Sequence, residues 1–244
     1  MTLAALPGLP EVRAGDDLAA LLAHAAGRLE GGLRPHDVLA VAHKVISKAE
    51  GRVVRVADID PGPRARALAA EHGKDPRHVQ AILEESAEVL RADAGRLICR
   101  TRHGFVCANA GVDASNAGAP ASLVLLPADP DASARALRRA LGCAVVITDS
   151  FGRAWRNGQC EVAIGCAGLA PADDWRGRVD ADGRELAATV IAIADEAAAA
   201  ADLARGKDTR EPAVRVRGLE DCIIDEAGPG AAALVRPPEE DLFR

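Results

Sequence analysis

Short apolar runs typical of β-strands alternate irregularly with amphipathic segments typical of helices along this 244-residue chain. Residues 97–102 and 105–108 are predicted to form two strands joined by His103-Gly104 in an antiparallel hairpin. A hairpin among interspersed helices favours a mixed α/β (α+β) fold with mixed or antiparallel sheets over a doubly wound fold. Further strands are expected at residues 2–6, 37–46, 122–126, 143–148 and 213–217, and helices after the cap Asp16 and at residues 63–72, 76–90, 131–141 and 185–205.

The core must be built from small aliphatic side chains. Apolar residues make up 49% of the chain, with 3 Phe, 2 Trp and no Tyr. The length is sufficient to bury a substantial core. No low-complexity linker or internal repeat divides the sequence, so a single domain is expected over residues 1–244, and any break between two lobes would lie near residues 127–130.

Charge and hydropathy exclude several classes of protein. The formal net charge is −6 and no basic block is present, which argues against a nucleic-acid partner. The chain has no basic, apolar leader and no apolar run near the roughly 18 residues that a membrane span needs. We therefore expect a cytoplasmic protein without a membrane partner. The six cysteines form no C-x-x-C pair and are expected to be reduced core residues.

Two polar stretches that follow apolar runs are the candidates for chemistry. Residues 109–116 read Asn-Ala-Gly-Val-Asp-Ala-Ser-Asn, and residues 148–159 read Thr-Asp-Ser-Phe-Gly-Arg-Ala-Trp-Arg-Asn-Gly-Gln. The strand predicted before the second stretch ends on Asp149, and a carboxylate at the end of a strand is well placed to bind a ligand in a crevice. Oxygen ligands beside the guanidinium groups of Arg153 and Arg156 suit a divalent ion that carries a phosphate.

Each of these residues also has a purely structural interpretation. Asp113 and Asn116 can make Asx turns, and Asp149 can cap a turn. Lys48, which follows the strand predicted at residues 37–46, can point either into water or at a phosphate. The sequence lacks both the G-x-x-x-x-G-K-[ST] and the G-x-G-x-x-G patterns, so a nucleotide would not be held by a P-loop and a dinucleotide cofactor is not expected.

Several short motifs occur together in a fixed order along almost the whole chain. They are Gly8-Leu-Pro-Glu-Val12, Gly15-Asp-Asp17, Ser47-Lys-Ala-Glu-Gly-Arg52, residues 109–116, Asp149-Ser-Phe-Gly-Arg153, Val162-Ala-Ile-Gly165, Asp182-Gly-Arg-Glu-Leu186 and Val216-Arg-Gly218. Any one of them is a weak signal. Together they closely resemble the coenzyme F-420-0:L-glutamate ligase family (CofE type, the F-420 gamma-glutamyl ligases).

The resemblance implies a GTP-dependent ligase of coenzyme F-420 biosynthesis that adds L-glutamate, through γ-linkages, to the deazaflavin precursor F-420-0. An acyl phosphate is the expected intermediate, because a free carboxylate is a poor electrophile for an amine. The resemblance also implies an unusual α/β fold, an intertwined homodimer, Mg²⁺ or Mn²⁺ at up to two ions per site, and K⁺ as an activator. The C-terminal flavin-binding domain that is fused to some relatives is not expected here.

Site residues are carried over by position from the same resemblance. Asp113 and Asp149 would hold one divalent ion, and Ser150 would lie on a second. Lys48 would act with the two aspartates to stabilise charge on the transferred phosphoryl group. The GTP site would be lined by Leu9, Pro10, Glu11, Val12, His43, Lys44, Lys48, Asn116, Arg205, Gly206, Lys207 and Asp208.

Position 207 departs from the pattern of some relatives, which carry an acid there, near the second metal. A charged lysine cannot ligate a cation, so Lys207 would meet phosphate instead and Asp208 would be the substitute ligand. Because the substrates are anionic, Arg153 and Arg156 are expected to bind them.

An aromatic face for the deazaflavin ring is expected from Trp155 or Trp175, although a tryptophan is more often a core residue. Two other functions stay open on the sequence alone. One is a non-catalytic nucleotide-binding or deazaflavin-binding homologue. The other is an amide ligase that acts on a different carboxylate.

Overall fold

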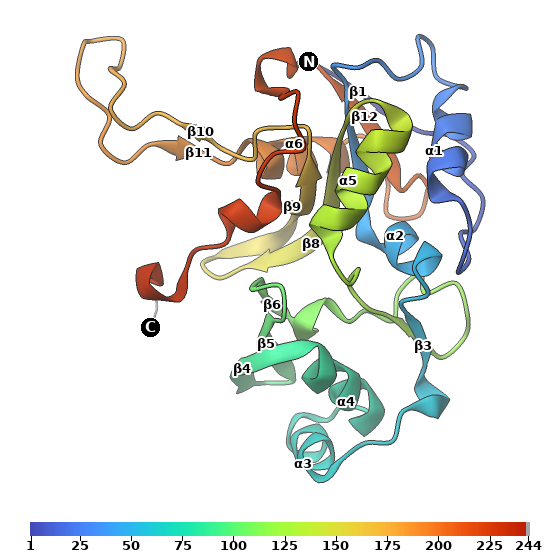
Figure 1. Ribbon diagram of the computed structural model, residues 1–244. Coiled ribbons are helices and arrows are strands. Elements are labelled where there is room, and N and C mark those ends of the chain that lie inside the picture. The colour runs from blue at the N-terminus through green and yellow to red at the C-terminus, as the bar shows by residue number, and fades with distance from the viewer. Residues whose placement is uncertain (243–244) are drawn as a thin grey trace.

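The structure is a computed structural model and describes residues 1–242 (Figure 1). Its centre is a five-stranded sheet in the order β1-β12-β2-β8-β9. Only the pairing between β2 and β8 is parallel, and the other neighbours in this sheet are antiparallel. The mixed α/β class predicted from the sequence is therefore confirmed. The strands are β1 (Thr2–Ala5), β2 (Val38–Ala42), β8 (Ala144–Arg153), β9 (Arg156–Ala167) and β12 (Ala213–Arg217).

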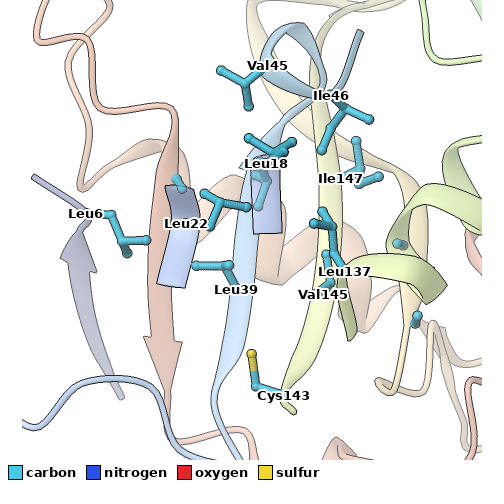
Figure 2. Packing of buried hydrophobic residues seen from close by; sticks show 14 of the residues in the cluster. Leu6, Leu18, Leu22, Leu39, Val45, Ile46, Leu137, Cys143, Val145 and Ile147 are labelled. Atoms are coloured by element: carbon cyan, nitrogen blue, oxygen red, sulfur yellow. The ribbon is translucent and has the colours of Figure 1, made fainter. Parts of the chain in front are cut away.

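Helices cover both faces of this sheet. Helices α1 (Leu18–Ala26) and α5 (Pro130–Leu141) pack on one face, and α6 (Ile193–Asp202) packs on the other (Figure 1). Successive residues of a strand point to opposite faces, so Leu39 lies in the core under α1 and α5, whereas Val38 lies under α6. The first of these core clusters is built mainly from leucine, valine and isoleucine side chains and includes Cys143, as Figure 2 shows.

The face under α6 is packed differently. The helix contributes four fully or almost fully buried alanines, Ala194, Ala197, Ala198 and Ala201, to its contact with the sheet. Alanine has the highest helix propensity and the smallest side chain that keeps it, so the helix can lie close to the strands. The small aliphatic side chains expected to build the core therefore form the contact between α6 and the sheet.

Residues 53–125 form a second group of elements with a separate core cluster, which lies beyond one end of the large sheet (Figure 1). A three-stranded antiparallel sheet, β4-β5-β6, packs with α3 and α4, and β3 pairs with β7. The bounds are β3 (Val53–Arg55), α3 (Pro63–His72), α4 (Pro76–Glu85), β4 (Ser86–Asp93), β5 (Arg96–Thr101), β6 (Val106–Ala108) and β7 (Ser122–Val124).

Strands β10 (Asp173–Asp174) and β11 (Val190–Ile191) form a two-stranded arm that extends away from the rest of the chain (Figure 1). Short 3-10 helices lie at Val56–Asp58, Asn109–Gly111, Glu220–Cys222, Ala231–Leu234 and Pro238–Glu240. Within residues 1–242, no helix combines the length and the apolar character that crossing a membrane would require. The six cysteines are free thiols, and burial raises the pKa of Cys107, Cys143 and Cys166 to about 12.

Several sequence expectations are corrected by the structure. The strand predicted at residues 37–46 ends at Ala42, where α2 (His43–Ala49) begins, so His43 belongs to a helix. A short apolar run has the same composition in a buried strand and in a buried helical turn, and periodicity cannot separate them. The helix expected at residues 76–90 ends at Glu85, because the chain continues as β4 and pairs with β5.

Four further boundaries differ from the expectation. The helix predicted at residues 185–205 covers only Ile193–Asp202, and α5 begins at Pro130, one residue before the predicted start. The N-cap of α1 is Asp17, whose carboxylate accepts a hydrogen bond from Ala20 N, and Asp16 instead accepts one from Arg13 N. The loop between β5 and β6 has three residues, 102–104, rather than the two that were predicted, because Thr101 N donates a hydrogen bond to Phe105 O.

A buried ion pair connects the start of β2 to the end of β12. Asp37 is 1% exposed and accepts hydrogen bonds from Arg217 at 2.7 and 2.9 Å and from Arg34 N at 2.7 Å. Burial alone would raise the pKa of Asp37, but these donors hold it below its ordinary value of 3.8. The stabilisation is therefore present at neutral pH and is lost as the pH falls below about 3.8.

Replacing Asp37 by alanine is expected to lower the free energy of unfolding at pH 7 by about 3 kcal/mol, because it leaves Arg217 and the Arg34 N–H without their acceptor. Urea denaturation followed by circular dichroism measures this difference. Asp93→Ala is the matched control, since its ion pair with Arg91 is exposed to solvent and should contribute little to stability. Equal losses in both variants would contradict the structural role of Asp37.

Candidate active site

A cavity of about 910 Å³ opens beside the carboxyl ends of β2 and of the first half of β8. Its walls come from Glu161 and from within residues 9–12, 42–48, 116–118, 148–150 and 205–212, which are far apart in the sequence. All of the residues that the resemblance assigns to GTP line this one cavity, namely Leu9, Pro10, Glu11, Val12, His43, Lys44, Lys48, Asn116, Arg205, Gly206, Lys207 and Asp208. Asp149 and Ser150 also line it, whereas Asp113 does not.

Asp149 and Ser150 lie inside a long hairpin. The sequence predicted that the strand ends at Asp149 and that a loop follows, but β8 continues to Arg153 and pairs with β9. In this register Asp149 lies opposite Val162, and Ser150 lies opposite Glu161. The hairpin holds both side chains on a regular backbone at the cavity wall, which fixes their positions more firmly than a loop would.

Helix α2 supplies the basic side chains of the cavity. Lys44 and Lys48 are four residues apart, so they lie on the same face of the helix. Lys48 is 8% exposed and its Nζ lies 2.5 Å from Glu11 Oε1. Gly118 has φ of +81°, and a Cβ there would lie 2.6 Å from the same Glu11 oxygen, so a side chain at this position would disturb the ion pair.

His43 is 2% exposed and lies between Ser47 and Asp149. Its Nδ1 is 3.3 Å from Ser47 Oγ. Its Nε2 is 3.4 Å from Asp149 Oδ1, an ion-pair distance whose geometry makes no hydrogen bond, and no other partner for this atom occurs within residues 1–242. This buried ring nitrogen therefore leaves a polar atom beside the Asp149 carboxylate for a water molecule or a ligand to satisfy.

Asp113 is held next to the cavity by Lys44. Lys44 Nζ donates to Asp113 Oδ2 at 2.7 Å and to Ser115 O and Oγ at 3.0 and 2.8 Å. Burial alone would raise the pKa of Asp113, but hydrogen bonds from Lys44 and Ser115 lower it below its ordinary value. Ser115 N also donates to Asp113 Oδ1 at 2.7 Å, so the Asx turn considered as the structural alternative is present as well.

The donor atoms at the cavity wall suit a divalent ion that arrives with a phosphate. Among residues 1–242 there is no group of three or more His, Cys, Asp or Glu side chains placed to enclose a metal. Mg²⁺ in nucleotide sites is usually bound by one or two carboxylates together with phosphate oxygens and water. The carboxylate of Asp149, 16% exposed, and the hydroxyl of Ser150 fit that arrangement.

Comparison with known proteins identifies the family. Residues 8–218 match the F420-0:Gamma-glutamyl ligase family. The chain belongs to this family. It is 46% identical over 242 residues to the coenzyme F420:L-glutamate ligase of Methanopyrus kandleri, which covers 96% of this chain and 94% of the relative. It is 44% identical over 253 residues to the enzyme of the same name from Methanothermobacter thermautotrophicus, an alignment that covers 100% of this chain and 99% of the relative. It is 48% identical over 249 residues to that of Halobacterium salinarum, with 98% of this chain and 94% of the relative covered.

Membership of the gamma-glutamyl ligase family makes the chain an amide-forming enzyme.

Glu161 is a residue of the site that was not predicted from the sequence. Glu161 is 4% exposed and accepts hydrogen bonds from Ser150 Oγ and, at 2.7 Å, from Arg205 Nη2. An acidic residue at the start of an otherwise apolar run was a detectable signal. Its partnership with Ser150 depends on the register of the β8–β9 hairpin, and that hairpin was not predicted from the sequence.

The predicted substrate arginines lie apart from the cavity of this gamma-glutamyl ligase. Arg153, Trp155 and Arg156 surround the turn of the β8–β9 hairpin and none of them lines the cavity. Arg153 donates to Asn157 O at 2.6 Å, and Trp155 is 79% exposed. Trp175 lies on the arm, where Arg178 stacks 5.0 Å above its ring.

Proposed function

We propose that this chain is a GTP-dependent ligase that adds L-glutamate, through γ-linkages, to F-420-0. The relatives named above, which match nearly the full length, support the choice of substrates. The composition of the cavity is the observation that supports a nucleotide as the co-substrate. Lysine and arginine side chains lie beside the carboxylate of Asp149 and the hydroxyl of Ser150, which are the groups that phosphates and a divalent ion require.

The proposed reaction has two steps. A carboxylate oxygen of F-420-0 forms a bond to the γ-phosphorus of GTP while the bond from that phosphorus to the bridging oxygen breaks, which gives GDP and an acyl phosphate. The amino group of glutamate then attacks the acyl carbon. The C–N bond forms, the C–O bond to phosphate breaks and the nitrogen loses a proton, so the products are the amide, GDP and phosphate.

The side chains at the cavity wall would position the reactants and balance their charge. Asp149 and Ser150 would hold Mg²⁺ or Mn²⁺, which when bound neutralises phosphate oxygens. Lys48 would donate to the phosphates from α2, and His43 would keep Asp149 in place from within the protein. In phosphoryl transfer such positioning and charge stabilisation supply most of the rate enhancement.

Asp113 requires a rearrangement before it could ligate the same ion as Asp149. Its carboxylate is paired with Lys44, and it lies outside the cavity wall. If Lys44 turned toward a nucleotide phosphate, its ion pair with Asp113 would break and the Asp113 carboxylate would be free to bind a metal ion. We therefore include Asp113 in the proposed metal site through exchange of this ion pair.

Mass spectrometry of F-420-0 incubated with the protein, L-glutamate, GTP and Mn²⁺ tests the proposal. Mass increments of one or more glutamyl residues that require GTP would support it. Unchanged F-420-0 with GTP bound but not hydrolysed would show a binding protein, and GTP hydrolysis stimulated by a different carboxylate would show another amide ligase. Replacement of GTP by ATP in the same assay tests the choice of nucleotide.

The proposal includes a homodimer, K⁺ activation and a single domain. The β10–β11 arm extends from the chain and offers a segment with which two copies could interlock (Figure 1). Light scattering coupled to size-exclusion chromatography measures the molecular mass, and a monomer would refute the dimer. Rates in KCl compared with NaCl at equal ionic strength test the activation.

Arg153→Ala is expected to raise the KM for F-420-0 or for glutamate about tenfold, if its guanidinium binds a substrate anion as the sequence predicts. The residue lies outside the cavity, so this role requires that substrate extend along the hairpin. Arg91→Ala, at an exposed position on β4 that does not line the cavity, is the control. Unchanged KM values for both substrates would show that Arg153 serves only its contacts with the carbonyl oxygens of Asn157 and Gly158.

A further inference from the structure

The ammonium group of Lys207 lies among three oxygen atoms at one end of the cavity. Its Nζ is 3.0 Å from Ser150 Oγ, 3.4 Å from Glu161 Oε1 and 3.3 Å from Asp202 Oδ1. A lysine ammonium has three N–H donors and no acceptor, so three oxygens match its capacity. We call these three atoms and their residues the oxygen cradle.

The two carboxylates of the cradle, Glu161 and Asp202, need a positively charged group between them. Glu161 is 4% exposed, and a buried carboxylate is costly unless it is paired. Arg205, with a side chain 7% exposed, covers the other oxygen of Glu161 at 2.7 Å and lies 3.4 Å from Asp202 Oδ1. One guanidinium faces two carboxylates, so one negative charge stays uncompensated until a second cation enters.

Lys207 differs from its neighbour Arg205 in being largely exposed to solvent. Its side chain is 71% exposed, and its ammonium group is held by the hydrogen bonds to the cradle oxygens. Two carboxylates and a hydroxyl at the edge of a cavity are also the donors that a hard divalent cation selects. The ammonium thus occupies the position that such a cation would otherwise take.

We propose that Lys207 serves as a built-in cation, so that this chain binds no divalent ion in the oxygen cradle, and that removing the ammonium turns the cradle into a divalent-cation site. The link to catalysis rests on the proposed function, because the cradle shares Ser150 with the proposed nucleotide metal. The occupancy of the cradle can nevertheless be measured without any turnover.

The test counts bound Mn²⁺ by the electron paramagnetic resonance signal of the free ion, in metal-free protein titrated with and without a non-hydrolysable GTP analogue. Lys207→Glu is expected to bind one more Mn²⁺ per chain than the wild type. Lys207→Gln, which removes the ammonium without adding a carboxylate, should show the same additional ion with at least about tenfold weaker affinity. Lys74→Glu, a charge reversal in the loop between α3 and α4, should match the wild type.

A second variant separates a specific site from a general effect of charge. Asp202→Asn in the Lys207→Glu background should abolish the additional ion, because it removes a cradle ligand at nearly constant shape. Equal Mn²⁺ counts and affinities in wild type and Lys207→Glu would overturn the inference, as would an additional ion that persists after Asp202→Asn. A wild type that binds no Mn²⁺ even with the nucleotide would refute the proposed metal role of Asp149, while the difference between wild type and Lys207→Glu would still decide the inference.

Thermal unfolding supplies an independent readout. In excess EDTA, Lys207→Glu should have a lower Tm than the wild type, because three carboxylates then face one guanidinium. Mn²⁺ should raise the Tm of Lys207→Glu more than that of the wild type, since a ligand that binds only the folded state stabilises it. Equal Mn²⁺ shifts in the two proteins would count against a new site in the cradle.

Discussion

Asp149→Asn is expected to reduce GTP-dependent glutamate ligation by about a hundred- to a thousandfold with the fold intact. The amide is nearly isosteric and can still accept the hydrogen bond from Ser150 N, which lies 2.8 Å from Asp149 Oδ1. What it loses is the negative charge that a divalent ion requires from its ligand. The loss should therefore appear in kcat rather than in the stability of the protein.

Steady-state rates with F-420-0, L-glutamate and Mn²⁺ measure this effect, and circular dichroism with thermal unfolding checks the fold. Asp93→Asn is the matched control, because it makes the same substitution at an exposed carboxylate on β4. Turnover of Asp149→Asn within about threefold of the wild type would remove Asp149 from the proposed metal site. The same substitution at Asp113 then shows whether the exchange of its ion pair with Lys44 is needed.

The sequence predicted best those elements whose ends carry local signals. The bounds of α3 and β12 agree with the expectation, and α3 has proline in its first turn and a left-handed Gly73 as its C-cap. Such residues act within a few positions of themselves. The end of β2 at Ala42 has no comparable signal, because the change from strand to helix there is imposed by the tertiary packing of His43 and its neighbours.

The candidate site shows the same division. Asp149 and Ser150 stood out in the sequence because polar oxygen donors followed an apolar run. Glu161 did not, because its place beside Ser150 follows from the pairing of two strands across a turn. The meeting of residues 9–12 with residues 205–212 at one cavity depends on the whole sheet, and only the family resemblance anticipated it.

Lys48→Met is expected to lower kcat/KM for GTP by about ten- to a hundredfold, the effect of losing one charge-assisted hydrogen bond to a phosphate. Methionine keeps most of the aliphatic volume of this 8% exposed side chain, so packing in α2 should be preserved. The same substitution at Lys74, which lies outside the cavity, is the control and should leave kcat/KM unchanged.

The ion pair between Lys48 and Glu11 adds a second effect that must be separated from the first. Removing the ammonium leaves the Glu11 carboxylate unpaired at the cavity wall, where it would repel the phosphates of GTP. Glu11→Gln alone should keep or improve GTP affinity, since Lys48 no longer has to leave a carboxylate to meet a phosphate. The double variant combines Lys48→Met with Glu11→Gln. If Lys48 binds phosphate directly, kcat/KM for GTP in the double variant stays about tenfold or more below that of the wild type, as expected for a lost hydrogen bond. If the double variant recovers wild-type kcat/KM, Lys48 only neutralises Glu11 and does not bind the nucleotide.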